Sequence, residues 1–362
     1  MTKDPSVISI VGARPNFVKL ASICKNFPKR LNHLIIHTGQ HYDFEMSEIF
    51  FKNFKIPKPN YNLEVGQGTR ADQVGKMIQK IEIVLLKENP DLVLVYGDTN
   101  STFAGAFAAS TSYIKLAHIE SGLRSFDRRM PEETNRILTD NLSDYLFAPT
   151  KTSILNLKRE NTIGKIIRSG DLSVEILNET KANLLRKKKK NTLVNLDPKS
   201  YNLFTMHRAE NTAKRDNLLA IIRSFEKLRN HDIVFPIHPR TKKVLESYSL
   251  LEKLINCRNV KVIEPVGYPD FIDLLLNSKK VITDSGGVQK EAYILSIPCV
   301  TIRENTEWVE TVAQGWNVLT GLNTNKIIHY VSNWHPAKKQ KPIFGKGNTS
   351  KIIKNEIEKL LK

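Results

Sequence analysis

Residues 91–122 read DLVLVYGDTNSTFAGAFAASTSYIKLAHIESG and contain one complete strand–helix–strand unit. Leu92–Tyr96 and Leu116–Ile119 are short apolar runs typical of buried strands, and Ser101–Ser112 between them has helical spacing. Neighbouring strands that are joined through a helix run parallel. This stretch therefore predicts a parallel α/β fold.

The same alternation continues on both sides of this unit and begins again after a lysine-rich segment. The other predicted strands are 7–11, 34–37 and 145–148 in the first half, and 203–206, 233–237, 260–263, 281–283 and 299–302 in the second. The other predicted helices are 17–26, 71–88, 132–142, 217–229, 268–277 and 288–295. Two such series predict two doubly wound α/β domains joined near residues 170–198, with a cleft between the carboxyl ends of their strands.

Length and composition fit a folded protein of two domains. The chain has 362 residues, 40% of them hydrophobic and 25% charged, and a domain takes about 150 residues. No stretch approaches the roughly 18 apolar residues of a membrane span, and Met1–Ser6 is polar, so we expect a cytoplasmic protein with no membrane partner. Cys24, Cys257 and Cys299 are far apart, which predicts neither a disulfide framework nor a metal site.

Charge alone leaves the kind of partner open. The chain has 55 Lys and Arg against 37 Asp and Glu, and the net charge of +18 fits a nucleic acid, an anionic membrane or a polyanionic small molecule. Much of the excess lies in residues 186–190 and in the lysines of residues 338–354, and no aromatic residue interrupts the first run. Solvated charge is therefore favoured, and no nucleic-acid partner is expected. A non-enzymatic polyanion-binding protein is the alternative.

A polar cluster follows the first predicted strand. Gly12-Ala13-Arg14-Pro15 is a tight turn that opens a helix, and Lys19 lies one turn further along. Arg14, Lys19 and the helix N-terminus fit the binding of a phosphate or a carboxylate. An ordinary strand-to-helix turn with two exposed cations fits the same residues.

Carboxylates follow later strands of the same predicted sheet, at Asp98, Glu120 and Glu132. We expect them near Arg124 and Arg136, because the ends of parallel strands meet at one edge of a sheet. Carboxylates grouped in this way fit general acid–base catalysis or an oxocarbenium-like transition state. A structural ion-pair network is the alternative, and Asp98 alone also fits a helix cap.

The second half of the chain places another set of polar residues after its strands. His207-Arg208 and His238-Pro239-Arg240 each follow a strand, and a histidine flanked by charged residues is more typical of a site than of a core. Asp284-Ser285-Gly286-Gly287 opens a helix that carries Glu291. Its backbone N–H groups fit a diphosphate, and Glu291 is placed to hold a ribose.

A dinucleotide-binding pattern in the first half is judged to be fortuitous. Gly66-Gln67-Gly68-Thr69-Arg70-Ala71 fits G-x-G-x-x-G/A, but Tyr61–Val65 before it mixes Asn and Glu and is not predicted to be a strand. Tyr-x-x-x-Lys, the usual proton relay of nicotinamide-dependent sugar epimerases, does not occur in the sequence. No nicotinamide cofactor is expected.

Taken together, these motifs resemble the non-hydrolysing UDP-N-acetylglucosamine 2-epimerase family from about Ser6 to Gly321. The matching segments, in the family's order and spacing, are 12–15 with Lys19, 38–41, 97–99, 120–124, 131–136, 207–211 and 284–291. The resemblance implies two Rossmann-like domains in a glycosyltransferase-B-like fold, with a UDP-sugar bound in the cleft. The first domain would be residues 1–172, with a C-terminal helix at 347–362 packing back on it, and the UDP-binding domain would be residues 173–346. A homodimer without any cofactor or metal is expected.

The activity implied by the resemblance is the interconversion of UDP-GlcNAc and UDP-ManNAc, by elimination of UDP to a 2-acetamidoglycal and re-addition. The implied catalytic residues are Asp98, Glu120, Glu132 and His207. The implied substrate-binding residues are Arg14, Lys19, Arg136, Phe271, Ser285, Gly286, Gly287 and Glu291.

Two departures from the family pattern bear on substrate and regulation. Thr306-Glu307-Trp308-Val309-Glu310 stands where well-known members have Thr-Glu-Arg-Pro-Glu, so Trp308 replaces an arginine expected to contact ligand. The Trp form resembles relatives that act on UDP-diacetamido-glucuronate, and 2-epimerisation of such a sugar is the alternative. A candidate allosteric UDP-GlcNAc site resembles that of some bacterial members, although Ala209 breaks their double arginine. Its residues would be Gln40, His41, Arg208 and His238.

Two other enzyme classes stay open at this point. A glycosyltransferase of the same architecture would also bind a UDP-sugar, although the acidic cluster of the first domain argues against it. A hydrolysing epimerase would differ only in the fate of the intermediate.

Overall fold

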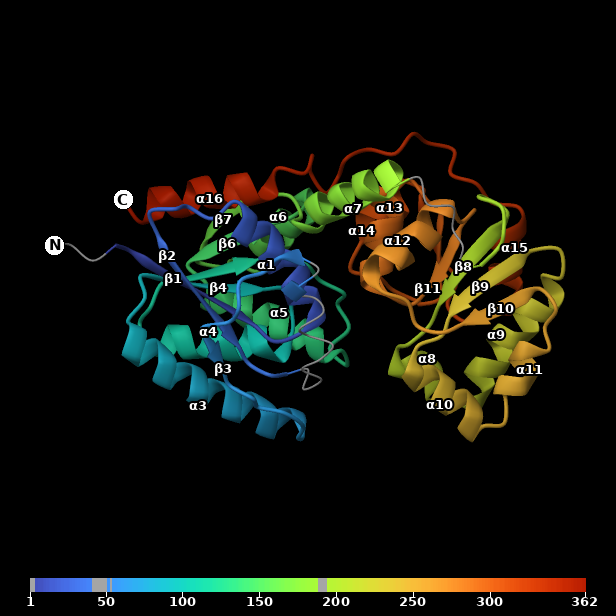
Figure 1. Cartoon of the computed structure of the whole chain (residues 1–362), viewed down its shortest axis with the longest axis horizontal. Helices are drawn as coiled ribbons and strands as arrows, with labels where there is room; N and C mark the ends of the chain where they lie inside the picture. The colour runs from blue at the N-terminus through green and yellow to red at the C-terminus, as the bar shows by residue number, and fades with distance from the viewer. Residues whose placement is uncertain (1–3, 41–50, 53, 188–193) are drawn as a thin grey trace. The chain divides into compact units, whose positions relative to one another are not determined.

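The computed structural model describes residues 4–40, 51–52, 54–187 and 194–362. The chain forms two compact units, called unit 1 (Met1–Ile176 with Ile343–Lys362) and unit 2 (Leu177–Pro342). Each unit contains one parallel sheet with helices on both faces (Figure 1). The prediction of two Rossmann-like α/β sheets is therefore confirmed.

The sheet of unit 1 runs in the order β3-β2-β1-β4-β5-β6-β7. Its strands are β1 (Ser6–Val11), β2 (Asn32–His37), β3 (Tyr61–Asn62), β4 (Leu92–Tyr96), β5 (Leu116–Ile119), β6 (Tyr145–Ala148) and β7 (Lys165–Arg168). All residues of β1 and β4 are buried, because both faces of a parallel sheet are covered, and their sequences are accordingly almost continuously apolar. The strand order reverses between β1 and β4, and α/β proteins bind ligands at the carboxyl ends of strands at such a point.

The edge strand β3 corrects one expectation from the sequence. Tyr61 and Asn62 pair in parallel with Ile36 and His37, although no strand is predicted between Tyr61 and Val65. The strand is two residues long and lies at the edge of the sheet. Its residues are not fully buried, so it lacks the apolar composition by which a strand is recognised.

The helices of unit 1 include one that is distant in sequence from the rest. They are α1 (Arg14–Lys25), α3 (Arg70–Glu88), α4 (Asn100–Thr111), α5 (Pro131–Leu142), α6 (Lys151–Arg159) and α16 (Thr349–Leu360), and α7 (Ser173–Lys187) runs from unit 1 into unit 2. The α16 helix lies beside α1, and Asn26 Nδ2 donates to Ser350 Oγ at 2.8 Å. Arg30 Nη2 also donates to the carbonyl of Glu358 at 2.8 Å. Both ends of the described chain therefore belong to the same unit.

Unit 2 contains a sheet with the order β10-β9-β8-β11-β12-β13. Its strands are β8 (Tyr201–Thr205), β9 (Asp232–Pro236), β10 (Val260–Ile263), β11 (Val281–Thr283), β12 (Cys299–Thr301) and β13 (Asn317–Leu319). Its helices are α8 (Ala209–Thr212), α9 (Arg215–Lys227), α10 (Pro239–Ser247), α11 (Leu251–Ile255), α12 (Tyr268–Asn277), α13 (Gly286–Ile294), α14 (Val309–Ala313) and α15 (Thr324–Ser332). The strand order reverses between β8 and β11, so the residues after these two strands lie at a point suited to ligand binding.

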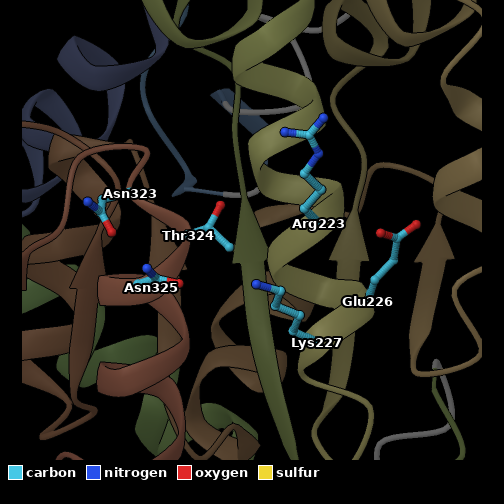
Figure 2. A pocket seen from close by; sticks show the side chains of 6 residues that line it. All are labelled: Arg223, Glu226, Lys227, Asn323, Thr324 and Asn325. Carbon is cyan, nitrogen blue, oxygen red and sulfur yellow. The ribbon is translucent and has the colours of Figure 1, made fainter.

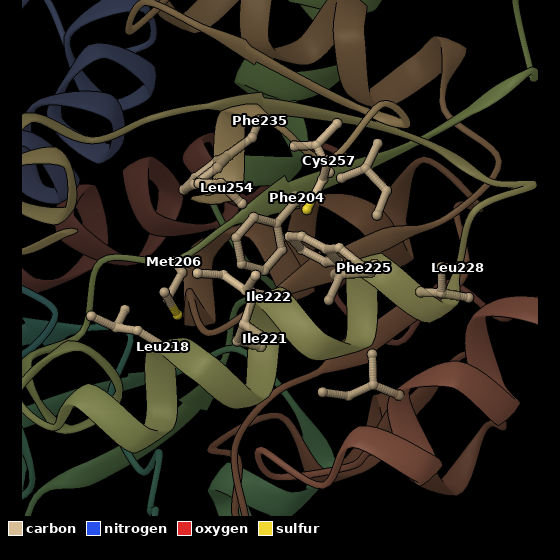
Figure 3. Close-up of a cluster of buried hydrophobic side chains, with 14 of the residues drawn as sticks. Phe204, Met206, Leu218, Ile221, Ile222, Phe225, Leu228, Phe235, Leu254 and Cys257 are labelled. Carbon is tan, nitrogen blue, oxygen red and sulfur yellow. The ribbon is translucent and has the colours of Figure 1, made fainter. Parts of the chain in front are cut away.

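Phe204 of β8 is central to the core on one face of this sheet (Figure 3). Its ring lies edge-to-face against Phe225, at 4.9 Å between centroids, and against Phe235, at 4.6 Å. All three side chains are buried. Edge-to-face pairs add about 0.5–1.5 kcal/mol beyond the burial of their area, so this cluster holds β8 and the polar residues that follow it.

His33 is a half-buried histidine at the amino end of β2 in unit 1, and it predicts acid-sensitive stability. Its Nε2 lies 2.8 Å from Ser9 Oγ, and its ring stacks on Phe27 at 3.9 Å. Burial lowers its pKa from 6.5 to about 4. The unfolded chain therefore binds more protons than the folded chain between these values, and stability is lost as the pH falls from 6.5 towards 4.

We expect the free energy of unfolding to fall by about 2 kcal/mol between pH 7 and pH 5 through His33 alone. Replacement of His33 by Gln keeps a hydrogen-bonding group for Ser9 and removes the titration. Urea titrations of wild type and variant at both pH values give the difference directly. An equal pH dependence in the two proteins would contradict this prediction.

Candidate active site

In unit 1, Lys19 of α1 and Glu120 after β5 form an ion pair above the turn at Gly97. Both side chains are largely buried, with exposed fractions of 8% and 10%. Gly97 has a φ of +67°, which favours glycine, and a Cβ on it would lie 2.7 Å from Lys19 Nζ and press on the ion pair. Glu120 has a φ of +74°, and such backbone strain in a residue other than glycine is often found at functional sites. The structure thus brings two predicted site residues together.

Asp98 and Arg136 form a second ion pair at the same edge of the sheet. Arg136 Nη2 lies 2.5 Å from Asp98 Oδ2, and Arg136 Nη1 donates to Glu133 Oε2 at 2.8 Å. Glu133 also accepts hydrogen bonds from Ser125 N and Oγ, both at 2.9 Å. The sequence analysis selected Glu132, which is partly exposed in the first turn of α5, and missed Glu133. The i, i+3 spacing of Glu133 and Arg136 on a helix is a signal that could have found it.

Arg124 lies elsewhere than predicted. It was expected beside the carboxylates of Asp98 and Glu120, but its guanidinium is buried against two other acidic residues. Arg124 Nη2 lies 2.7 Å from Asp140 Oδ2, and Arg124 Nε donates to Glu160 Oε1 at 2.7 Å. This pairing was not predicted because the partners lie 16 and 36 residues further along the chain, on α5 and after α6.

In unit 2, Asp284 joins the ends of β8 and β11. Its fully buried carboxylate accepts hydrogen bonds from the backbone N–H of His207 at 3.1 Å and of Arg208 at 2.9 Å. Asn211 Nδ2 donates to it at 3.1 Å. The sequence predicts Asp284 only as part of the motif that opens α13. The role of Asp284 in shaping this turn depends on contacts between residues after two different strands, β8 and β11.

His207 lies over this turn with its ring stacked on His238, at 5.8 Å between centroids. Burial lowers its pKa below 6.5, and Arg208 and Arg240 act in the same direction, while Asp284 opposes them. The imidazole is therefore neutral at pH 7 and carries one N–H that can donate to an anion. His238 itself caps α10, because its Nδ1 accepts from Arg240 N at 3.2 Å.

The first turn of α13 contains the glycines of the predicted diphosphate site. Ser285 caps the helix, and its Oγ accepts from Val288 N at 3.4 Å. A Cβ on Gly286 would lie 1.9 Å from Glu307 Oε1, so this glycine is required by packing. A Cβ on Gly287 would find Ser285 Oγ at 3.8 Å as its nearest neighbour, so the protein leaves space there. Unpaired N–H groups at the start of a helix form an anion site.

Three other residues of interest in unit 2 lie on α12, on α13 and directly before α14. Glu291 is partly buried on α13, and Phe271 of α12 packs against the core. Trp308 is buried, with an exposed fraction of 3%, and Lys290 Nζ lies 4.7 Å from the centre of its ring. This cation–π contact fixes the tryptophan that stands where family members have arginine.

The remaining predicted residues do not form one cluster within either unit. Gln40 belongs to unit 1, where its Oε1 accepts from Ser101 N at 3.0 Å, whereas Arg208 and His238 belong to unit 2. His41 and the side chain of Arg14 lie outside the described residues, although Arg14 begins α1.

A pocket of about 390 Å³ in unit 2 is separate from these strand ends (Figure 2). It lies between α9 and the start of α15 and is lined by Arg223, Glu226, Lys227, Asn323, Thr324 and Asn325. None of these described residues belongs to the predicted site.

The described residues show no sign of a membrane span or of a metal centre. Across these ranges, no helix combines the length and the apolar composition that crossing a bilayer requires. Nor do the same ranges group three or more His, Cys, Asp or Glu side chains in a way that could hold a metal ion.

Comparison with known proteins agrees with these features. The family model described as UDP-N-acetylglucosamine 2-epimerase matches residues 25–358. A UDP-N-acetylglucosamine 2-epimerase homolog of Methanococcus maripaludis is 54% identical over 96% of this chain and 98% of its own. The UDP-2,3-diacetamido-2,3-dideoxy-D-glucuronate 2-epimerase of Pseudomonas aeruginosa is 44% identical over 98% and 99% of the two chains.

A solved structure extends the likeness to three dimensions. The crystal structure of Methanocaldococcus jannaschii UDP-GlcNAc 2-epimerase in complex with UDP-GlcNAc and UDP matches with a TM-score of 0.87 and 44% identity. The match covers 98% of this chain and 99% of that one. With its fold, its motifs and these relatives in agreement, the chain belongs to the UDP-N-acetylglucosamine 2-epimerase family.

Proposed function

We propose that this protein is a non-hydrolysing epimerase that interconverts UDP-GlcNAc and UDP-ManNAc. The observation that carries the proposal is the carboxyl edge of unit 1, where Glu120 and Asp98 lie at neighbouring strand ends and each contacts its own cation. The relative from Methanocaldococcus jannaschii, solved with UDP-GlcNAc and UDP, supports the choice of substrate.

The chemistry explains why such an edge is needed. The C2 hydrogen of the sugar is not next to a carbonyl group, so it becomes acidic only as the C1–O bond breaks and its electrons leave with UDP. A carboxylate then takes the C2 proton, and the electrons of the C–H bond form the C1=C2 bond of a 2-acetamidoglycal. In the return step, a carboxylic acid protonates C2 on the other face, and an oxygen of UDP attacks C1.

Protonation on the opposite face calls for two acid–base groups in different positions. We assign this work to Asp98, Glu120 and Glu132. Arg136 and Lys19 hold the first two in place through ion pairs at the ends of neighbouring strands.

We assign the UDP portion to unit 2. The first turn of α13, from Ser285 to Gly287, would donate backbone hydrogen bonds to the diphosphate, and neutral His207 would donate one more. Glu291 would hold the ribose, and Phe271 would complete the binding set. Negative charge that develops on the leaving diphosphate is stabilised by donors that are already in place.

Trp308 favours a second candidate substrate, a UDP-2,3-diacetamido-glucuronate. The tryptophan is buried and held by Lys290, and one relative at 44% identity is named for that sugar. The reaction at C2 would be the same for both substrates, so only the groups that contact the sugar differ.

Proton NMR of the purified protein with UDP-GlcNAc in deuterium oxide tests this function. We expect UDP-ManNAc signals to grow without added nicotinamide, metal or acceptor, and deuterium to enter at C2. Release of free ManNAc would indicate the hydrolysing reaction instead. If UDP-GlcNAc stays unchanged and UDP-2,3-diacetamido-glucuronate is epimerised, the second substrate is correct.

We also propose that the protein acts in the cytoplasm as a homodimer that supplies a surface or wall polysaccharide. Sedimentation velocity of the whole chain would give the mass of the particle. Regulation by UDP-GlcNAc through Gln40, His41, Arg208 and His238 would appear as sigmoidal dependence of the rate on that sugar.

A further inference from the structure

His118 is a fully buried histidine of β5, and its two ring nitrogens contact two different segments next to the candidate site of unit 1. Its Nδ1 lies 2.7 Å from Asp140 Oδ1, and its Nε2 lies 2.7 Å from the carbonyl oxygen of Gly97. Both neighbours are acceptors, so each ring nitrogen of His118 faces an oxygen to which an N–H can donate. The carbonyl of Gly97 is the last group before Asp98, and His118 therefore anchors the turn that presents Asp98.

Asp140 connects His118 to a second turn, which contains Gly122. Its Oδ2 accepts a hydrogen bond from Gly122 N at 3.0 Å and lies 2.7 Å from Arg124 Nη2. Burial acts to raise the pKa of Asp140, but His118 and Arg124 outweigh it and hold the pKa below its usual range. Asp140 is thus a carboxylate in the folded protein. Its two oxygens contact His118, Gly122 and Arg124.

The second turn follows Glu120 directly. Gly122 has a φ of +77°, and a Cβ on it would lie 2.4 Å from the carbonyl oxygen of Ser153, so this turn packs closely on α6 and requires glycine. One buried pair, His118 with Asp140, therefore connects the turn before Asp98 to the turn after Glu120. Neither side chain is exposed, so neither reaches a ligand.

We propose that His118 and Asp140 are positioning residues that set the distance between the two proposed acid–base groups, Asp98 and Glu120. The proposal rests on the function proposed above. A misplacement of about 1 Å can cost roughly 100-fold in rate, so a pair that contacts no substrate can still govern turnover.

Two substitutions of His118 separate its two hydrogen bonds. Asn places its amide N–H near the position of Nδ1 and can reach Asp140, whereas Gln places its amide near Nε2 and can reach Gly97. Each variant breaks one of the two links between the turns, so His118→Asn and His118→Gln should each lower kcat by about 10-fold to 100-fold. KM and UDP affinity should stay close to wild type in both, because unit 2 is unchanged. The glycal released per turnover should rise in the Asn variant.

His33→Gln is the control, because it removes a half-buried, hydrogen-bonded histidine from the amino end of β2 in the same unit. Loss of stability alone would lower the melting temperature in all three variants and leave the kcat of the folded protein unchanged. Equal kcat in His118→Asn, His118→Gln and His33→Gln would therefore overturn the proposal.

Asp140→Asn is the second variant, for the case in which His118→Asn does not fold. It keeps the size of the side chain and loses its charge, and we expect lower kcat with more released glycal. Wild-type turnover and glycal release in this variant would also overturn the proposal. A wild-type protein that epimerises neither UDP-sugar would overturn the proposed function and this inference with it, so the two failures are distinguished.

Discussion

Replacement of Asp98 by Asn, or of Glu120 by Gln, should lower turnover of the UDP-sugar by about 100-fold or more, the scale expected for a lost acid–base group. Both substitutions keep the size of the side chain, and each removes one carboxylate from a cation of the site, Arg136 or Lys19. UDP binding should be largely retained, since it is assigned to unit 2. Initial rates by NMR and UDP titration by calorimetry separate the two effects.

A matched control is Asp72→Asn, which removes the carboxylate of an exposed ion pair with Lys76 on α3. Surface pairs of this kind contribute about 0–1 kcal/mol, so its turnover should equal that of wild type. Wild-type rates in both Asp98→Asn and Glu120→Gln would remove the assignment of catalysis to this edge. A loss in only one of them would mean that the other carboxylate is not an acid–base group, and that another residue acts on that face of C2.

Replacement of Gly287 by Ala should weaken UDP binding by about 10-fold or more without lowering stability. The folded protein leaves space for a methyl group at this position, and Ala in a helix is favoured over Gly by about 1 kcal/mol. A loss of affinity would therefore arise from a ligand that approaches the backbone closely. UDP titration by calorimetry and thermal unfolding without ligand give the two quantities.

Two other glycines provide the comparison. Gly75→Ala, in the middle of α3 where a Cβ meets nothing within 4 Å, should increase stability in the same way and leave UDP affinity unchanged. Gly286→Ala should lower both, because its Cβ would displace Glu307 from its buried contact with Arg303 at 2.9 Å. Unchanged UDP affinity in Gly287→Ala would place the diphosphate elsewhere.

The central strands were predictable because buried strands consist mainly of apolar residues. The limits of β4, β5 and β6 match the expected ranges residue for residue, and each is apolar over most of its length. The edge strands β3 and β7 were not predicted. Lys165 and Arg168 at the ends of β7 are exposed, so its sequence has neither a continuous nor a clear alternating pattern.

The places of the candidate residues were predictable where these residues directly follow strands, and not where they depend on distant partners. Lys19 and Glu120 are 101 residues apart in the sequence and belong to different motifs, and the fold brings their side chains into contact. No role was predicted for His118 or Asp140. A histidine within a strand resembles an ordinary core residue, and an aspartate within a helix resembles an ordinary surface residue. Arg124 was misplaced for the same reason, since its acidic partners are known only once α5 and α6 are in position.

The return of α16 to α1 has a consequence for how such proteins diversify. Unit 2 is one uninterrupted stretch of sequence, Leu177–Pro342, while unit 1 is encoded on both sides of it. A single genetic crossover between two relatives within unit 2 would place α1 of one parent beside α16 of the other, although the contacts of Asn26 and Arg30 join these two segments. Exchange of unit 2 between relatives, with unit 1 kept intact, therefore requires two crossovers, one near each boundary.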